Sequence, residues 1–459
     1  MNIDFLKEIT ADRQELIDIR RDFHRHPDMT GHEEPTIERI AGYLKSFGID
    51  HEIVEDGGLF GFIYGESYRP HSKEDDTKYE DGTPAPEIPT VMLRADVDAL
   101  PVQESETNLS QKKVCVSENP GLCHACGHDT HISMLLMAAK HLNEHRDQIK
   151  GRVVLCFERG EEGPNNIVFL MRRIVKTKLH IDTVFGQHIY FALESGKISL
   201  RKGPVMAGGV FWKVKLTGRG GHGSRPDMAA NPIDCYVALS NAVNEFRMKH
   251  ADPFHALTYA PCFVHSGSVD NVIPGELTFG GNLRLYEPED GVAFKEFFVK
   301  AMDQICPLYG CTYEIDYMIG PKMPVKNDAA CTELAREVIG RAIGEDRIVE
   351  TEPWMACESI CALLAMYPGV FAFLGTKDPE KGCGALHHSP EFDSDEDVLP
   401  LGAAAACAYA VGFLDAPPKD AAGWFDGTPA DFYKYSGYSD AVVNFLRDGA
   451  PYKIREGAR

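Results

Sequence analysis

The order of apolar and polar positions along the chain predicts an α/β fold. Four short apolar runs, each ending abruptly in polar residues, are typical of buried parallel strands. They cover residues 91–93, 153–157, 184–185 and 370–374. Helical spacing of apolar residues occurs between such runs and before them, over 10–48 and 131–145. We therefore expect a mostly parallel sheet flanked by helices.

The middle of the chain has a different pattern. Apolar and charged residues alternate over 211–216 and, less strictly, over 277–286, as in antiparallel strands with one face in water. We predict an inserted α+β domain at 209–320, which interrupts a parallel-sheet domain made of 1–208 and 321–414. The remaining extension, 415–459, holds eight aromatic side chains, too many for a disordered tail, so we expect it to pack against the fold.

Composition narrows the classes of partner. The chain has 459 residues, of which 44% are hydrophobic, enough for two or three domains with buried cores. Its 47 Lys and Arg face 69 Asp and Glu, a net charge of −22, which disfavours nucleic acid and an anionic membrane as partners. Seven of the acidic residues and four prolines lie within 66–90, and we expect an exposed insertion there.

Targeting signals and cysteines indicate a cytoplasmic protein. The first 27 residues contain neither the apolar core of a signal peptide nor an Arg- and Ser-rich, acid-poor transit sequence. The longest apolar stretch, 398–414, contains Pro400 and mostly Ala and Gly, and we interpret it as a buried helix. Thirteen cysteines without an export signal indicate reduced thiols.

Side chains that bind metals follow each predicted strand or precede the helix at 131. In open α/β sheets, ligands bind beyond the carboxyl ends of the strands. Each such residue alone has an ordinary structural explanation, but the same coincidence at five places favours a shared site. Mixed sulfur, nitrogen and oxygen ligands suit zinc, manganese, nickel or cobalt, and their number predicts two nearby ions. The candidates are Asp96, Asp98, Cys126, His128, Glu161, Glu162, His188 and the adjacent His387 and His388.

Two such ions have a common chemical use. They lower the pKa of a bound water and polarise a carbonyl group. One of the adjacent carboxylates Glu161 and Glu162 can bind metal while the other takes the proton of the water. Amide or ester hydrolysis is the reaction class that follows.

The segments that contain these candidate residues resemble those of the co-catalytic metallo-amidohydrolases, a family that includes aminoacylases, hippurate hydrolases and indole-acetyl-amino-acid hydrolases. The resemblance covers the chain from about Arg20 to about Leu414, in the family's order and approximate spacing. It implies Glu161 as the general base, with Asp98 and, more weakly, Asp96 orienting ligands. His388 fits the family's motif better than its neighbour His387. The implied metal ligands are Cys126, His128, Glu162, His188 and His388.

The inserted domain resembles the family's lid and dimerisation domain. His222, within Gly218–Gly223, matches the lid histidine that stabilises an oxyanion, typically across a dimer. Asn271 and Arg284 match residues that hold the substrate's amide oxygen and carboxylate. The resemblance thus implies a homodimer that binds two divalent ions, zinc or manganese, or else nickel or cobalt, and a small N-acyl amino acid or peptide-like substrate. A departure at Glu358, which Ser and Ile follow where the family has Asp and Phe, bears on the substrate.

Three alternatives stand beside an N-acyl-amino-acid hydrolase. A dipeptidase or carboxypeptidase of the same family would use the same residues. A non-catalytic metal-binding protein would not need an unligated Glu161 beside the water. Gly218–Gly223 also fits a G-x-G-x-x-G dinucleotide fingerprint, but the strand before it alternates with Lys213 and Lys215, and no helix opens directly on the glycines.

Overall fold

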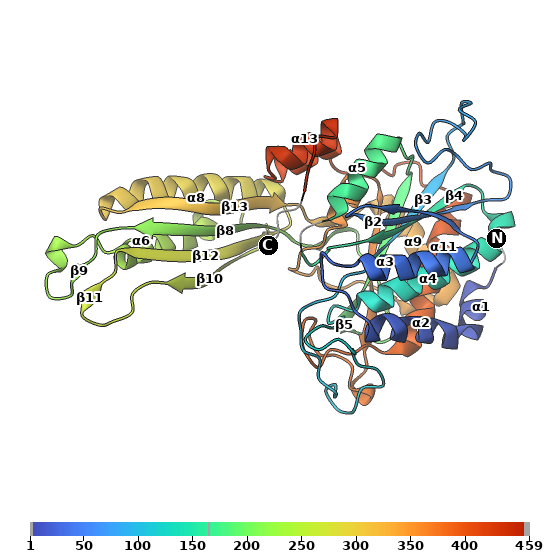
Figure 1. The fold of residues 1–459 in the computed structure, drawn as a ribbon, viewed down its shortest axis with the longest axis horizontal. Helices are drawn as coiled ribbons and strands as arrows, with labels where there is room; N and C mark the ends of the chain where they lie inside the picture. Colours follow the sequence, from blue (N-terminus) through green and yellow to red (C-terminus); the bar gives the residue numbers. More distant parts are fainter. Residues whose placement is uncertain (1–2, 164–165, 454–459) are drawn as a thin grey trace.

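The computed structural model describes residues 3–163 and 166–453. An eight-stranded sheet forms the larger part, and a four-stranded sheet projects from it (Figure 1). The four predicted strands are consecutive in the large sheet, as β4-β3-β5-β16, and all three pairings between them are parallel, which confirms the α/β prediction. In spatial order the strands are β1 (Asp50–Val54), β2 (Gly58–Tyr64), β4 (Arg152–Glu158), β3 (Thr90–Asp96), β5 (Thr183–Glu194), β16 (Gly369–Lys377), β6 (Ile198–Ser199) and β15 (Ile348–Val349).

Helices cover both faces of this sheet because its strands are apolar on both sides. In β3, Val91 and Leu93 belong to one core cluster, whereas Met92 belongs to the other, as the two-residue period of a strand requires. The first face packs against α1 (Phe5–Ala11), α2 (Arg13–Arg25), α3 (Glu34–Ser46), α4 (His128–Glu144), α9 (Ala329–Ile343) and α11 (Leu399–Asp415). The second packs against α5 (Ile167–Thr177), α10 (Cys361–Met366), α12 (Pro429–Tyr435) and α13 (Asp440–Asp448).

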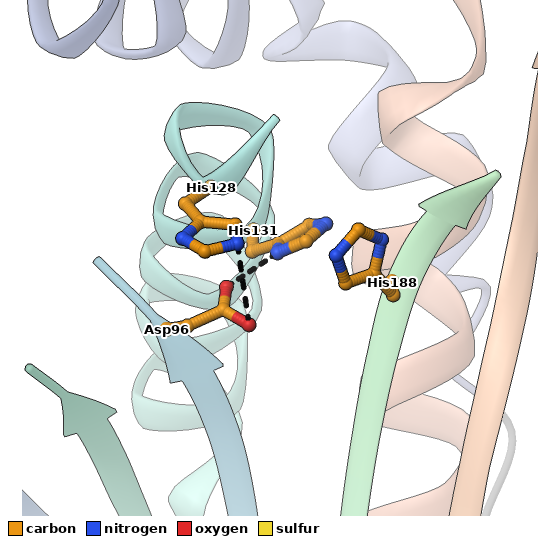
Figure 2. A group of neighbouring side chains, drawn as sticks. All are labelled: Asp96, His128, His131 and His188. Atoms are coloured by element: carbon orange, nitrogen blue, oxygen red, sulfur yellow. Dashed lines mark hydrogen bonds and ion pairs between the residues drawn. The ribbon is translucent and has the colours of Figure 1, made fainter. Parts of the chain in front are cut away.

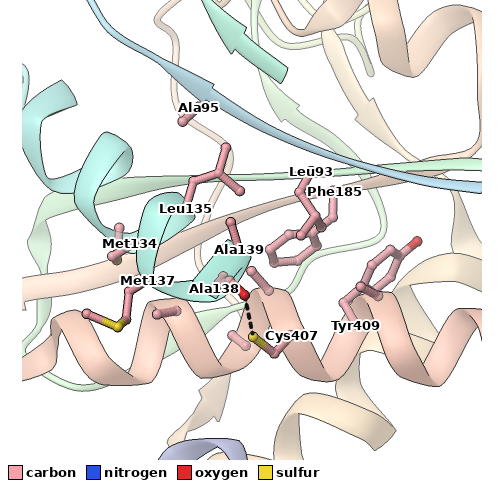
Figure 3. Close-up of a cluster of buried hydrophobic side chains, with 14 of the residues drawn as sticks. Leu93, Ala95, Met134, Leu135, Met137, Ala138, Ala139, Phe185, Cys407 and Tyr409 are labelled. Carbon is pink, nitrogen blue, oxygen red and sulfur yellow. Dashed lines mark hydrogen bonds between the residues drawn. The ribbon is translucent and has the colours of Figure 1, made fainter. Parts of the chain in front are cut away.

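Two apolar helices, α4 and α11, pack together in the centre of the first core (Figure 3). Small side chains such as Ala138 let the helices approach closely, and the Cys407 thiol donates to the Ala138 carbonyl at 3.6 Å. The segment Glu396–Asp415 is long and apolar enough to cross a membrane by length and composition, but 83% of its apolar window is buried inside the protein. The prediction of a buried helix at 398–414 is confirmed.

The second sheet is antiparallel, with strand order β10-β12-β8-β13 and helices α6 (Pro232–Asn244) and α8 (Pro288–Leu308) packed on it. Its strands are β8 (Gly208–Thr217), β10 (Leu257–His265), β12 (Glu276–Leu285) and β13 (Thr312–Lys322). Trp212 alternates with the lysines of β8 and is 1% exposed, because it packs among the aromatic rings of α8. The alternation over 211–216 and 277–286 therefore belongs to antiparallel strands, as predicted. At the far end, β9 (Gly221–His222) pairs with β11 (Val272–Ile273).

The insertion at 66–90 is more deeply packed than its composition predicts. His71 and Asp76 are 4% and 7% exposed. The two oxygens of Asp76 accept from the guanidinium of buried Arg152 on β4, at 2.5 and 2.8 Å, and they anchor the segment to the sheet. The prediction of an exposed segment is wrong at this point, because a buried arginine on the sheet needs a counter-charge that the insertion supplies.

Asp76→Asn is expected to destabilise the protein by about 3–5 kcal/mol, since it leaves Arg152 buried without its counter-charge. Burial alone would raise the pKa of Asp76, but the hydrogen bonds and charge of Arg152 outweigh burial and hold this pKa below its ordinary value. The stabilisation is therefore complete at neutral pH and declines below about pH 4. Urea unfolding at several pH values measures both effects. Asp81→Asn is the matched control, because its ion pair with Arg69 is exposed to solvent and is expected to change the free energy of unfolding much less.

The C-terminal extension packs against the fold, as predicted. Its helices α12 and α13 bury Phe432, Tyr433 and Leu446 in the second core, where α13 contacts α5. A capping box at Thr428 and Asp431 fixes the start of α12.

Candidate metal centre

The predicted metal-binding side chains meet at the carboxyl edge of the parallel strands. Asp96 is the last residue of β3, His188 lies in β5, and Glu161 and Glu162 follow the end of β4. His128 begins helix α4, which packs against these strands. The geometry of a parallel sheet thus gathers residues that are far apart in the sequence.

A glycine makes the close approach of helix α4 possible. Gly127 has a φ of 87°, and a Cβ atom there would lie 2.2 Å from Cδ1 of Ile189 on β5. Only glycine adopts this left-handed backbone without strain and leaves the space that Ile189 fills. Cys126 and His128 flank this glycine, and each of them belongs to a group of potential metal ligands.

Two imidazoles present their Nε2 atoms to the cluster (Figure 2). His128 donates from Nδ1 to Asp98 at 3.0 Å, and His188 donates from Nδ1 to the Ile189 carbonyl at 2.6 Å. Metal-binding histidines are usually held in this way, with the second ring nitrogen bonded to a carboxylate or a carbonyl. The Nε2 atom of His188 lies 3.5 Å from the Cys126 sulfur.

His131 belongs to the cluster, and sequence reasoning did not select it as a site residue. Its Nδ1 is bonded to Asp96 at 2.5 Å, and its Nε2 accepts from the Ile189 amide at 3.0 Å. Both ring nitrogens are therefore used, so His131 positions Asp96 (Figure 2). The signal was its spacing of three residues from His128, which places the two rings on one face of a helix.

The remaining candidates lie beside Cys126. The Cys126 sulfur and one ligand atom each of Glu162 and His388 lie within 4.8 Å of one another. His388 Nε2 is 2.8 Å from a Glu162 oxygen, and its backbone has a φ of 66°, which is uncommon outside glycine. His387 instead points its ring among His188, Phe191 and Phe392, and burial lowers its pKa to about 3. The structure thus brings His388, and not His387, next to Glu162.

The residues present fit a pair of cations. In the described part of the chain, the buried Nε2 of His128 has no hydrogen-bond partner, and it lies 3.8 Å from an oxygen of Asp96. Burial alone would lower the pKa of His128, but Asp96 and Asp98 raise it to about 10, so the surroundings stabilise positive charge at this ring. Three groups of potential ligands are linked by shared members, since His128 belongs to two of them and Glu162 to two. This arrangement matches two adjacent metal positions. They are Asp96 with His128, His131 and His188; Cys126 with Glu162 and His388; and His128 with Glu161 and Glu162.

Asp98 holds two of the candidate ligands at once. One of its oxygens accepts from His128 Nδ1, and the other accepts from the Glu162 backbone amide at 2.9 Å. Asp98→Asn replaces one acceptor with a donor, and we expect metal affinity to fall about 10–100-fold. Titration calorimetry with zinc or manganese measures this loss. Asp182→Asn is the control, because Asp182 also accepts from a histidine and a backbone amide, but before the start of β5; an equal loss there would contradict a local effect.

Glu161 lies beside the cluster and is held by a loop from the other half of the chain. The Ser359 amide donates to its Oε1 at 3.1 Å. Burial raises the pKa of Glu161 well above its ordinary value, and the charges of Glu358 and Glu162 raise it further. Glu358 itself pairs with Arg94 at 2.9 Å, so the residues at the Glu-Ser-Ile departure support the site.

A cavity of about 520 Å³ opens beside these residues. Glu161, Glu162 and His388 line one part of it, and Phe211 and Tyr317 from the second sheet line another. It is large enough for a small organic substrate.

The three candidates on the second sheet lie at its two ends. His222 and Asn271 are exposed at its far tip, at β9 and beside β11, away from the metal-binding cluster of the same chain (Figure 1). Arg284 lies at the near end, where it donates to the Cys357 sulfur at 2.7 Å and its guanidinium lies 4.8 Å from the Phe211 ring centre. Arg284 is therefore beside the cavity, since both of these contact residues line it.

Known proteins are similar to this chain in sequence and in fold. Residues 92–411 match the sequence profile of Peptidase family M20/M25/M40. The chain is 33% identical to thermostable carboxypeptidase 1 of Saccharolobus solfataricus, over 90% of this chain and 99% of the relative. It is 30% identical to IAA-amino acid hydrolase ILR1-like 4 of Arabidopsis thaliana, over 87% of this chain and 86% of the relative. A solved Bacillus subtilis structure, described as a dinuclear metal binding peptidase from family M20, superposes with a TM-score of 0.69 at 26% identity, covering 88% of this chain and 99% of the other.

Proposed function

The chain belongs to peptidase family M20/M25/M40, whose members are metal-dependent hydrolases of amide bonds, and we propose that it hydrolyses N-acyl amino acids with Glu161 as general base. The observation that carries the proposal is the position of Glu161. Its carboxylate is held by a backbone amide, lines the cavity and stands next to a metal-binding cluster.

For the metal ions we propose zinc or manganese, with nickel or cobalt as alternatives. When bound, such ions supply an activated water and a polarised carbonyl group. The residues that would hold them have ligand atoms in the groups described above. They are Cys126, His128, Glu162, His188 and His388. Asp98 fixes the His128 ring, and Asp96, itself held by His131, is the weaker candidate for similar work.

Glu161 performs the proton transfers. Its Oε1 accepts from the Ser359 amide, which leaves Oε2 to take a proton from the attacking water. Its burial among other carboxylates makes it more basic than an exposed glutamate. The hydroxyl oxygen adds to the carbonyl carbon, the same Glu161 oxygen gives its proton to the amide nitrogen, and the C–N bond breaks. The acyl product passes its remaining acidic proton to the released amine or to solvent and departs as a carboxylate.

The second sheet supplies the rest of the site. We propose that residues 209–320 form a lid and dimerisation domain, and that His222 and Asn271 act in the active site of a partner chain. This explains why they lie together at an exposed tip, away from the cluster of their own chain. Arg284, beside the cavity, binds the substrate's carboxylate, since its planar guanidinium offers two N–H groups to two oxygens.

A hydrolysis panel tests this function. The protein is loaded with manganese or zinc and assayed on N-acetyl, N-benzoyl and N-indoleacetyl amino acids, on dipeptides and on longer peptides. We expect the N-acyl amino acids to be cleaved with the highest kcat/KM. Preferential release of the C-terminal residue from longer peptides would favour carboxypeptidase activity, which the Saccharolobus relative's name describes. Metal binding without turnover of any substrate would contradict the enzymatic proposal.

A further inference from the structure

The C-terminal extension reaches the same cavity as the metal-binding cluster. Phe432, Tyr433, Ser436 and Tyr438 line the cavity together with Glu161 and His388. These four residues lie beyond residue 411, where the match to the family profile ends. The extension is therefore part of the wall that a substrate meets.

This wall is fixed against the second sheet. Gly437 has a φ of 74°, and a Cβ atom there would lie 2.5 Å from the carbonyl oxygen of Gly320 in β13. Phe432 and Tyr433 are anchored in the second core, at 3% and 1% exposed. The extension and strand β13 thus form one continuous side of the cavity.

Two buried hydroxyl groups on this wall are unsatisfied. Within residues 3–163 and 166–453, neither the Tyr433 hydroxyl nor the Ser436 hydroxyl has a hydrogen-bond partner. A buried polar group without a partner costs about 1–3 kcal/mol, so such groups are usually kept where a ligand or water completes them. Both residues line the cavity that leads to Glu161.

A cation lines the same cavity as these hydroxyl groups. Lys322, at the end of β13, lines the cavity, and its ammonium is 5.4 Å from the Phe211 ring centre. Tyr438 and, more weakly, Cys357 raise the pKa of Lys322, which therefore remains charged at neutral pH. The polar groups of this wall can all donate hydrogen bonds, and Phe211 and Phe432 offer aromatic surface beside them.

We propose that the C-terminal extension determines substrate specificity, and that Lys322, Tyr433, Ser436 and Tyr438 form a subsite for an aromatic acyl group carrying a carboxylate. Aromatic walls favour a planar acyl group, and a wall with an ammonium and hydroxyl groups favours an anionic substituent on that acyl group. The inference rests on the proposed function, because that function assigns the amino-acid carboxylate to Arg284 and leaves Lys322 for the acyl part.

A matched series of substrates tests the subsite on the metal-loaded protein. One amino acid is acylated with acetyl, benzoyl or 4-carboxybenzoyl groups, and kcat/KM is measured for each. We expect acetyl to be slowest and 4-carboxybenzoyl to exceed benzoyl by about tenfold or more, as hydrogen bonds to charged groups allow. Lys322→Met keeps the apolar part of the side chain and is expected to abolish the carboxylate preference, so that kcat/KM for the 4-carboxybenzoyl substrate falls to about that of the benzoyl substrate.

Variants separate the subsite from a general effect on folding or catalysis. Lys326→Met is the control, because Lys326 lies over the Trp424 ring and does not line the cavity. Ser436→Ala and Tyr438→Phe provide a second measurement if Lys322→Met misfolds, and each is expected to reduce the same preference. Hydrolysis without a carboxylate preference, or an equal loss for all three substrates in the variants, would overturn the subsite alone. If none of the three substrates is hydrolysed, the proposed function is overturned as well.

Discussion

Glu161→Gln is expected to lower kcat by about 10²–10⁴-fold, the usual contribution of a general base, while the protein keeps its metal. The amide occupies the same space and still accepts from the Ser359 amide, but it cannot take a proton from water. Steady-state kinetics measures the loss, and elemental analysis of the purified variant measures the metal content.

Glu391→Gln is the control for this substitution. Glu391 lies three residues from His388 but is exposed and bonded only to Ser389 among side chains of the described residues. It should keep full activity. Full activity of Glu161→Gln would show that another group is the base, and loss of its metal would show that Glu161 is a ligand.

His222→Ala is expected to lower kcat by about 10²–10³-fold, the cost of removing one oxyanion donor. Because His222 is exposed at the tip of the second sheet, this effect requires a partner chain. His265→Ala, on exposed strand β10, serves as the control and should keep its activity.

Mixed dimers separate action within one chain from action across two. When Glu161→Gln and His222→Ala chains are co-expressed with different tags, half of the randomly formed dimers are mixed, and one of their two sites has both native residues. The mixture should then recover about a quarter of the wild-type activity, from the two-fold symmetry of such a dimer. Recovery of none would show that the two residues act in the same chain.

The cluster could be predicted because its residues follow regular strands. Asp96 and His188 are recognisable once β3 and β5 are identified as parallel, since such strands end at one edge of a sheet. Two strands of the second sheet, β8 and β12, follow from their alternation for a similar reason, since a strand with one wet face has a period of two.

Other features depend on contacts that have no local pattern. The role of His131 follows from the Ile189 amide, which occupies its second nitrogen. Burial of Asp76 follows from Arg152, a distant residue on a central strand. The aromatic content of the extension indicates packing but not that Tyr433 and Ser436 face the cavity, because helical position alone does not specify the neighbour.

The chain order of the large sheet has a consequence for protein synthesis. Strand β16 and helix α11 complete its first core, yet the ribosome makes them only after the whole four-stranded sheet. The four-stranded sheet has a core of its own from one continuous segment and can fold as soon as it emerges. The amino-terminal segments keep part of their apolar surface exposed until β16 and α11 have been synthesised and can cover it. His388, one of the proposed metal ligands, is also made late, so we expect a chain that ends before it to lack the proposed metal centre and its hydrolytic activity.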